Sequence, residues 1–328
     1  MLATRIIPAL LTCDCAITLR KIMKITNKYG PNTTILLPGS CDAKCGFCFW
    51  NRAEAKIKPP NTYIDDVFHI LENLPDKFVA LSISGGEPTL SPIFMEFISK
   101  LTEYRRAHIL QRVVLTTHGG HLTGKLASIA RVVDHINISR HAIGTNKNRD
   151  VFKSNNIPSD DELLTLIQQI HSETLCDVTL NCVIQPDVSI EFCNKFIEYA
   201  KALGADAVSF RKIASDVTPT DAELAFSRKY PVVAESKCPV CRGKSQTVNG
   251  YDVRWKGSVL EPSIATNGVY EAVIHPDGKV YTDWGMKYPL ELDKKVPKIA
   301  KRAKPLARTR MSYRGGGRAY CGTGFGGC

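Results

Sequence analysis

The chain has 328 residues, of which 44% are hydrophobic and 23% charged, as expected for a globular protein with a sizeable buried core. No apolar run approaches the roughly 20 residues that cross a bilayer, so we expect no membrane partner. Lysine and arginine outnumber aspartate and glutamate by 43 to 32, a net charge of +11. This charge favours an anionic partner such as a nucleotide, a nucleic acid (including DNA) or phosphate, and the alternative is a generally basic surface with no such partner.

Residues 1–22 read as an N-terminal extension before a core that spans 23–230. The apolar segment 6–17 is short, contains two cysteines and an aspartate, and lacks a small-residue cleavage site, which argues against a signal peptide. Met23 offers a second start codon. The chain's 12 cysteines fall into tight clusters, which favours metal ligation in the reducing cytoplasm over disulfides.

Short β-rich apolar segments alternate with segments of helical periodicity through the core. The predicted strands are 34–37, 78–84, 112–116, 135–139, 178–184 and 207–211. The predicted helices are 64–74, 92–104, 122–130, 160–171 (with Ser159 as its N-cap) and 190–203 (with Gly204 as its stop). This alternation predicts an α/β fold with parallel strands and outer helices, a partial (β/α)6 TIM-like barrel.

Residues 231–328 form a C-terminal region of different character. Asn249-Gly250 and Asp277-Gly278 are hairpin-turn signals within β-type segments, 247–255 and 270–284. The last 38 residues hold ten basic side chains against two acidic ones and end in a glycine-rich sequence. That tail is either a disordered segment or a nucleic-acid contact, with Tyr313, Tyr320 and Phe325 available to stack on bases.

Three cysteines, Cys41, Cys45 and Cys48, follow the first predicted strand within eight residues. Three thiolates on a tight loop can hold three corners of a 4Fe–4S cluster and leave one iron open to another ligand. Zinc is the rival, but it takes four ligands, usually in a two-plus-two arrangement. The end of the first strand of a βα series is also where barrels place their chemistry.

This loop resembles that of the radical S-adenosylmethionine (SAM) superfamily, C-x3-C-x-aromatic-C, with Phe47 in the aromatic position. A second motif of the family, the sequence SGGEP at 84–88, follows the second strand, and the resemblance covers about 33–213. It implies a 4Fe–4S cluster on the three cysteines and reductive cleavage of SAM to a 5′-deoxyadenosyl radical. It also implies an electron donor of the flavodoxin or ferredoxin type.

The resemblance assigns further residues to cofactor binding. These are Phe47, Gly85, Gly86, Glu87, Ser139, Arg140 and Asn181. The glycines would let the backbone approach SAM, and the glutamate would lie near its ammonium group. The competing interpretation is a plain turn at the glycines and ordinary polar residues at the barrel mouth. His118 stands where many relatives have asparagine, and we assign it no role.

A second metal site is a separate prediction. Cys238-x2-Cys241 has the spacing of a metal knuckle, and Cys321 and Cys328 would complete four ligands for zinc or a second iron–sulfur cluster. The alternatives are a zinc site completed by other residues, or free thiols. The other internal cysteines, Cys176, Cys182 and Cys193, alternate with apolar residues and are expected in the core.

The sequence does not name the substrate. The basic balance favours a nucleotide or nucleic-acid base, and the lack of a recognisable auxiliary-cluster pattern favours redox-neutral isomerisation. Phage-type members of the superfamily, which rearrange amino-acid adducts of thymine in DNA, are similar in size and charge. The alternatives are a molybdenum-cofactor-cyclase-like enzyme or peptide maturase with an auxiliary cluster, and a zinc-dependent nucleic-acid-binding module.

Overall fold

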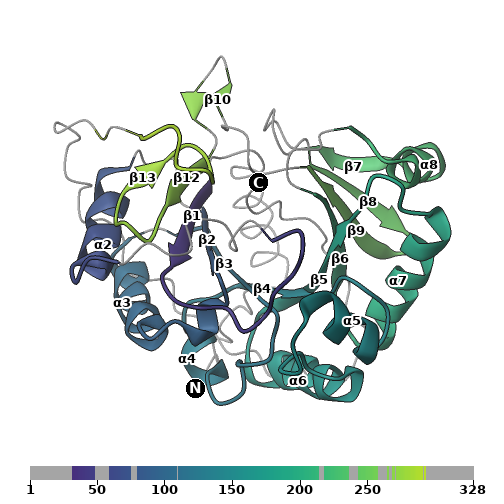
Figure 1. Cartoon of the computed structure of the whole chain (residues 1–328), viewed down its shortest axis with the longest axis horizontal. Coiled ribbons are helices and arrows are strands. Elements are labelled where there is room, and N and C mark those ends of the chain that lie inside the picture. The colour runs from purple at the N-terminus through teal and green to yellow at the C-terminus, as the bar shows by residue number, and fades with distance from the viewer. Residues whose placement is uncertain are drawn as a thin grey trace, which may run out of the picture.

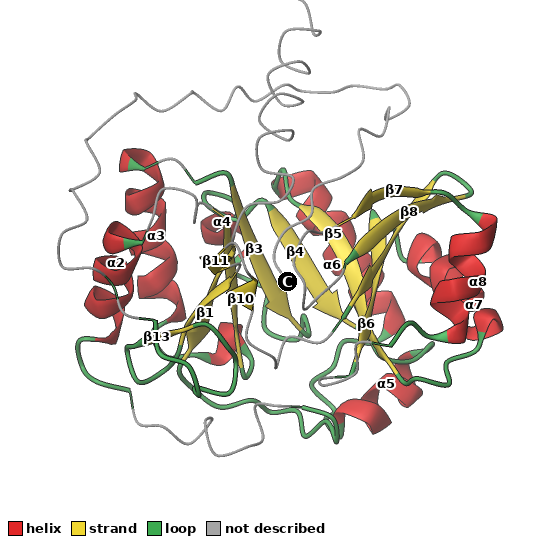
Figure 2. Cartoon of the chain, turned by 90° about the horizontal axis from the view of Figure 1, so that it is seen from above, coloured by secondary structure: helices red, strands yellow, loops and turns green. Residues whose placement is uncertain are grey.

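The computed structural model describes residues 32–48, 59–74, 80–108, 110–213, 218–235, 243–257, 264–265, 268–269, 271–290 and 292. The strands curve into a half-barrel with helices along its outer side (Figure 1). Figure 2 shows the strands from above, between α2 and α3 on one side and α7 and α8 on the other. Among the described residues, no helix is long and apolar enough to cross a membrane.

The six predicted strands all form, with bounds within two residues of those expected. They are β1 (Asn32–Leu37), β2 (Ala80–Gly85), β3 (Arg112–Thr117), β4 (His135–Ser139), β5 (Asp177–Ile184) and β6 (Ala207–Lys212). They pair in chain order, and every pairing is parallel. The predicted partial (β/α)6 barrel is therefore confirmed.

The helices match the prediction less closely. They are α2 (Tyr63–Asn73), the 3-10 helix η3 (Pro88–Leu90), α3 (Phe94–Ala107), α4 (Leu126–Ile129), α5 (Thr145–Phe152), α6 (Asp160–Glu173), α7 (Ile190–Ala202) and α8 (Asp221–Lys229). The predicted helix 122–130 shrinks to the single turn of α4, because Gly124 before it takes a φ of +78°. Ser159 and Glu162 form the capping box that begins α6.

The strands beyond residue 231 extend the same sheet at both edges. At one edge β9 (Tyr251–Lys256) runs parallel to β6, followed by antiparallel β8 (Lys244–Val248) and β7 (Val232–Glu235). At the other, β12 (Glu271–Ile274) runs parallel to β1 and pairs with β13 (Val280–Tyr281). Both predicted hairpins are confirmed, and β10 (Ile264–Ala265) pairs separately with β11 (Gly268–Val269). The domain boundary at 230/231 stays a prediction.

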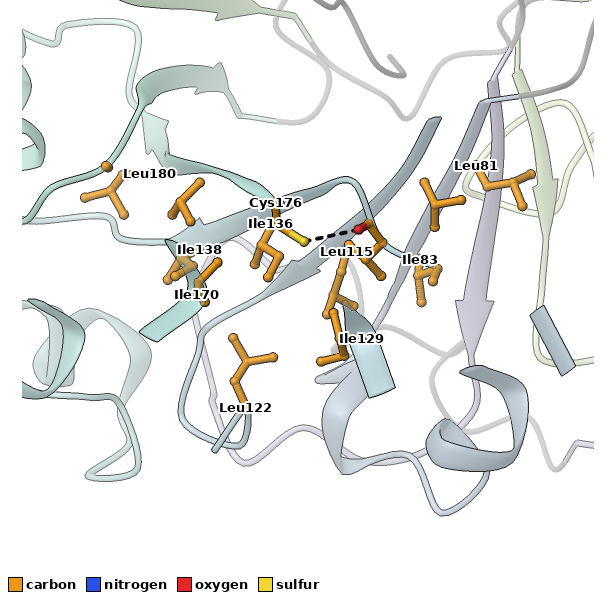
Figure 3. Close-up of a cluster of buried hydrophobic side chains, with 14 of the residues drawn as sticks. Leu81, Ile83, Leu115, Leu122, Ile129, Ile136, Ile138, Ile170, Cys176 and Leu180 are labelled. Carbon is orange, nitrogen blue, oxygen red and sulfur yellow. Dashed lines mark hydrogen bonds between the residues drawn. The ribbon is translucent and has the colours of Figure 1, made fainter. Parts of the chain in front are cut away.

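The two faces of the sheet have opposite characters, because side chains alternate along each strand. The outer face is apolar and packs on the helices to form the main core (Figure 3). Cys176 lies in this core and its thiol donates to the Val133 carbonyl at 3.1 Å; Cys182 and Cys193 are buried there too, as expected. The inner, concave face therefore carries the alternate, mostly polar positions, which are discussed below.

Gly85 brings the carboxyl ends of β1 and β2 together. Its φ is +141°, and a Cβ atom built on it would lie 2.6 Å from the carbonyl oxygen of Leu37. No side chain fits there without moving one strand away from the other. This is the physical reason for glycine at the first position of the predicted Gly-Gly-Glu motif.

We predict that Gly85→Ala lowers the free energy of unfolding by about 2 kcal/mol, from backbone strain and the clash with Leu37. The measurement is equilibrium unfolding in urea. Gly46→Ala is the matched control in the neighbouring loop, because nothing lies within 4 Å of its added Cβ. That control should change the same free energy by less than about 0.5 kcal/mol. Equal urea midpoints of unfolding for Gly85→Ala and Gly46→Ala would contradict the close packing of Gly85 against Leu37.

Candidate active site

The candidate site lies along the edge formed by the carboxyl ends of the parallel strands. The cysteine loop follows β1, the Gly-Gly-Glu turn follows β2, and His118 follows β3. The loops also contact each other directly: the Glu87 amide donates to the Ser40 carbonyl at 3.4 Å, and the Ser91 hydroxyl donates to the Pro38 carbonyl at 2.5 Å. The topology thus brings together motifs that are about 40 residues apart in sequence.

The cysteine loop packs between two small apolar clusters. Cys41 and Cys48 pack on one side against a cluster formed by Leu36, Val273 and Trp284. On the other side all three cysteines lie in a cluster with Ala43, Phe47, Phe152 and Ile157. A backbone hydrogen bond from the Lys44 amide to the Phe152 carbonyl, 2.7 Å long, ties the loop to the end of α5. The loop is therefore anchored to β1, β12 and α5 at once.

The three thiols lie close enough to influence one another's charge. Burial, with smaller contributions from nearby Glu87, Asp42 and Cys48, raises the pKa of Cys41 to about 11, although a backbone hydrogen bond from Ala43 opposes the rise. Burial, together with the charges of Cys48 and Cys41, raises the pKa of Cys45 to about 12. Three clustered, half-buried or buried sulfur atoms on one loop are a donor set that fits an iron–sulfur cluster, whose irons would displace the thiol protons.

Phe47, the aromatic residue of the motif, packs against residues that follow β4 and end α5. Its ring meets the His141 ring edge-on at 4.9 Å, and His141 stacks on Phe152 at 4.8 Å. The Val183 amide donates to Nδ1 of His141 at 3.1 Å, and burial lowers the pKa of that imidazole to about 3. Phe47 is thus held by a neutral histidine that joins the end of β4 to β5. The contacts that the structure shows for Phe47 are packing contacts.

Glu87 is buried, with 2% of its surface exposed, and both of its carboxylate oxygens accept hydrogen bonds. Oε1 accepts from the Thr89 amide at 3.1 Å, the Thr89 hydroxyl at 2.5 Å and the Thr117 hydroxyl at 2.6 Å. Oε2 accepts from the amide of His118 at 2.9 Å. The carboxylate therefore binds the loop after β2 to the loop after β3.

His118, to which the sequence assigned no role, connects that carboxylate to the cysteine loop. The Gly120 amide donates to its Nδ1 at 3.1 Å, so its Nε2 carries the proton and donates to Asp42 at 2.8 Å. Asp42 also accepts from His121 at 2.9 Å and from Asn156 at 2.7 Å. Burial alone would raise the pKa of Asp42, but these hydrogen bonds outweigh it and lower the pKa to about 2.

Asp42, His118 and His121 also have the spacing of a metal site, since their ligand atoms lie within 4.8 Å of one another. The hydrogen bonds already account for that spacing without an ion. Sequence reasoning missed Asp42, His121 and Asn156. The signal it passed over was the pair of histidines that frames two glycines just after β3.

The predicted residues of β4 and β5 divide into two groups. Ser139 and Asn181 are register partners on neighbouring strands, at the same edge as the cysteine loop. Arg140 lies in the helical layer instead: its side chain is fully buried and donates to the Pro158 carbonyl at 2.7 Å. Its neighbours there include Tyr199 and Asp160, which belong to α7 and α6. The structure thus keeps Arg140 apart from the other predicted contacts.

The cysteines of the predicted second metal site lie outside the described residues. They are Cys238, Cys241, Cys321 and Cys328. None of the six cysteines within the described part of the chain forms a disulfide.

Gly86, the second glycine of the Gly-Gly-Glu motif, follows Gly85 at the edge of the sheet and is half-buried.

Comparisons with known proteins agree with this geometry. A curated S-adenosylmethionine-dependent nucleotide dehydratase from Flammeovirga pacifica is 27% identical over 183 residues, 53% of this chain. The chain matches 61% of that protein, about three fifths of its length. SuiB from Streptococcus suis bound to precursor peptide SuiA has a TM-score of 0.53 at 14% identity, covering 85% of this chain and 67% of SuiB.

SuiB bound to S-adenosylmethionine is also similar, with a TM-score of 0.51 at 14% identity, covering 85% of this chain and 65% of that chain. At such identity the two structures establish a common fold and nothing more. The family model of the radical SAM superfamily matches residues 35–200, about half of the chain. Members of that family use a 4Fe–4S cluster and SAM, and this chain belongs to the radical SAM superfamily.

Proposed function

We propose that Cys41, Cys45 and Cys48 hold a 4Fe–4S cluster whose fourth iron binds SAM, and that the enzyme acts on a nucleotide or nucleic-acid base. The observation that carries the first part is the position of three mutually close thiols on one clamped loop at the carboxyl edge of a parallel half-barrel. When bound, the cluster and SAM together supply a 5′-deoxyadenosyl radical that takes a hydrogen atom from the substrate.

The residues of the same edge would hold and orient SAM. Gly85 and Gly86 offer backbone groups with no side chain in the way, and Ser139 and Asn181 offer a hydroxyl and an amide from adjacent strands. Glu87 acts as a positioning residue, because both of its oxygens are already engaged with Thr89, Thr117 and His118. Its expected contact with the SAM ammonium group remains a prediction.

Two observations support a nucleotide or base as the substrate. The concave face of β6 and β9 carries the basic side chains of Arg211, Arg254 and Lys256, which suit phosphate. The nucleotide dehydratase from Flammeovirga pacifica has a name that points to the same class. The reaction that we favour is a redox-neutral rearrangement, in which hydrogen leaves the substrate, a group migrates and hydrogen returns.

The test of this function is anaerobic reconstitution followed by incubation with SAM and dithionite. We predict about four irons per chain and release of 5′-deoxyadenosine that nucleotides or oligonucleotides accelerate. Cys45→Ala should abolish that release, because the cluster loses a ligand. Cys193→Ala removes a thiol that lies in the core, away from the loop, and should leave the release unchanged.

Three outcomes would contradict the proposal. A Cys45→Ala variant that still cleaves SAM reductively would exclude the ligand assignment. About eight irons per chain, with release accelerated by peptides alone, would indicate a maturase with an auxiliary cluster. Zinc bound in place of iron would indicate a zinc-dependent nucleic-acid-binding module instead of an enzyme.

We further predict that His118→Ala shortens the lifetime of the reconstituted cluster, because Asp42 loses a hydrogen bond that fixes the cysteine loop. Loss of such a supporting contact weakens metal binding by about tenfold or more. The measurement is the rate of iron release to a chelator. His118→Gln keeps an N–H donor for Asp42 and should recover part of the lifetime.

The matched control for that variant is His171→Ala. His171 also donates from Nε2 to an aspartate, Asp206 at 2.8 Å, but on the helical side of the fold. Its loss should leave iron release unchanged. Equal release rates from His118→Ala and the unmodified protein would exclude a positioning role for His118.

A further inference from the structure

The polar concave face divides into two halves that differ in how their side chains are satisfied. On β12, β1 and β2 the polar groups bind one another in a continuous chain. The Ser82 hydroxyl donates to Asn32 at 3.3 Å, Asn32 donates to the Thr34 hydroxyl at 3.0 Å, and Thr34 donates to Glu271 at 2.6 Å. The polar groups of this half are therefore already hydrogen-bonded to one another. A ligand could bond only to those of their oxygens that have a free lone pair.

On β4, β5 and β6 three buried polar atoms have no hydrogen-bond partner. They are Nδ1 of His135, Oγ1 of Thr179 and Oγ of Ser209, in side chains at most 2% exposed. Strand alternation puts all three on the concave face, because their neighbours Ile136, Leu180, Phe210 and Val208 belong to the outer core. An unsatisfied buried polar group costs about 1–3 kcal/mol, so three together indicate a place that a polar ligand completes.

Basic side chains surround these atoms. Ser209 is the register partner of Arg254 on β9, and Arg211 on the same face is the partner of Lys256. Burial lowers the pKa of His135 well below its usual value, and the charges of Arg112, Arg254 and Lys256 lower it further. Three cations from β3 and β9 therefore converge on one imidazole.

Three carboxylates lie near these cations and must be counted with them. Asp134 raises the pKa of Arg112, but it is paired with Arg105 of α3 on the helical side of the sheet. The other two lie on the concave face. Asp177 is the register partner of His135, and its charge raises the pKa of Arg112. The Asp252 carboxylate lies 3.4 Å from the Arg254 guanidinium. From β3 to β9 the concave positions thus hold four basic side chains against two carboxylates, on strands whose register is continuous. They are Arg112, Arg211, Arg254 and Lys256 against Asp177 and Asp252. The balance favours an anion.

We propose that Thr179, Ser209 and Arg254, with Lys256 beside them, bind the phosphate end of a free nucleotide. The hydroxyls and the guanidinium are the donors that phosphate oxygens accept. This inference rests on the proposed function, and it narrows the substrate class from nucleotide or nucleic acid to a free nucleotide.

The position of these residues across the sheet supports a terminal phosphate. Asn181 is the register partner of Ser209, and Ser209 is the register partner of Arg254, so both phosphate donors lie level with the predicted SAM contact on the next two strands. Two strand spacings, about 10 Å, separate Asn181 from Arg254. That distance is comparable with the span from the outer phosphate of a nucleotide to its sugar, so the sugar or base would lie beside the SAM contacts. A phosphate within a DNA strand continues in two directions, and both would have to leave the concave face. A terminal phosphate needs only one exit.

The experiment is isothermal titration calorimetry with the reconstituted protein, using nucleoside triphosphates, the matching nucleosides and a DNA oligonucleotide. We expect the triphosphates to bind at least about tenfold more tightly than the nucleosides. Arg254→Gln should remove that advantage, and so should the double variant Thr179→Val with Ser209→Ala, which adds no charge change. Lys195→Gln removes an exposed charge of α7 and is the charge-matched control. Circular dichroism establishes that each variant is folded.

The outcomes separate this site from the proposed function. If Arg254→Gln and the double variant bind triphosphates as the unmodified protein does, the phosphate site is excluded, even where nucleotides accelerate SAM cleavage. If triphosphates bind through Arg254 but accelerate no SAM cleavage, the site stands and the proposed function fails. Tight binding of DNA with no binding of free nucleotides would overturn the inference in favour of a polymer substrate.

Discussion

The whole site depends on the parallel pairing of β1 to β5. Parallel strands place all of their carboxyl ends at one edge, so loops that are far apart in sequence meet there without any special folding of the loops themselves. The close approach of Gly85 to Leu37 tightens that edge where the cysteine loop begins. Each motif of the site is then held by a short connection to a buried strand.

Two carboxylates turn this common edge into one rigid unit. Glu87 joins the loops after β2 and β3, and Asp42 joins the cysteine loop to His118, His121 and Asn156. Both carboxylates are hydrogen-bonded by several donors, which offsets the cost of burying charge. Since an iron–sulfur cluster needs its thiolates in a fixed geometry, this network gives the chain a physical means to preserve that geometry.

The concave face adds a second layer to the same design. Strand alternation sends apolar side chains to the helices and polar ones inward, so the interior is charged while the exterior packs as an ordinary core. The basic groups of β3, β6 and β9 lie on that inner face, below or beside the predicted SAM contacts. Cofactor chemistry and substrate recognition would thus occupy neighbouring strands of one sheet.

Much of this arrangement could be predicted from the sequence, because apolar periodicity fixes the strands and the cysteine spacing is distinctive. The six strands and the shared edge of Cys41, Gly85 and Asn181 follow from those signals. Helix α5 could not be predicted, since its sequence, TNKNRDVF, carries no apolar stripe.

Tertiary contacts account for the other differences. Arg140 was expected to contact the cofactor together with Ser139. Consecutive side chains of an extended chain point to opposite faces, so the Arg140 side chain enters the helical layer and that of Ser139 does not. The role of His118 depends on Asp42, which is 76 residues away and not visible in a local pattern. The strands β9 and β12 had clear hairpin signals, yet their addition to opposite edges of one sheet is a long-range pairing.

The most direct test of the central claim is electron paramagnetic resonance of the reduced, reconstituted protein with and without SAM. If one iron lacks a protein thiolate and binds SAM, the spectrum of the reduced cluster must change when SAM is added, and Cys41→Ala, Cys45→Ala or Cys48→Ala must lose the signal. A spectrum that SAM leaves unchanged, or a signal that survives in those variants, would contradict the account.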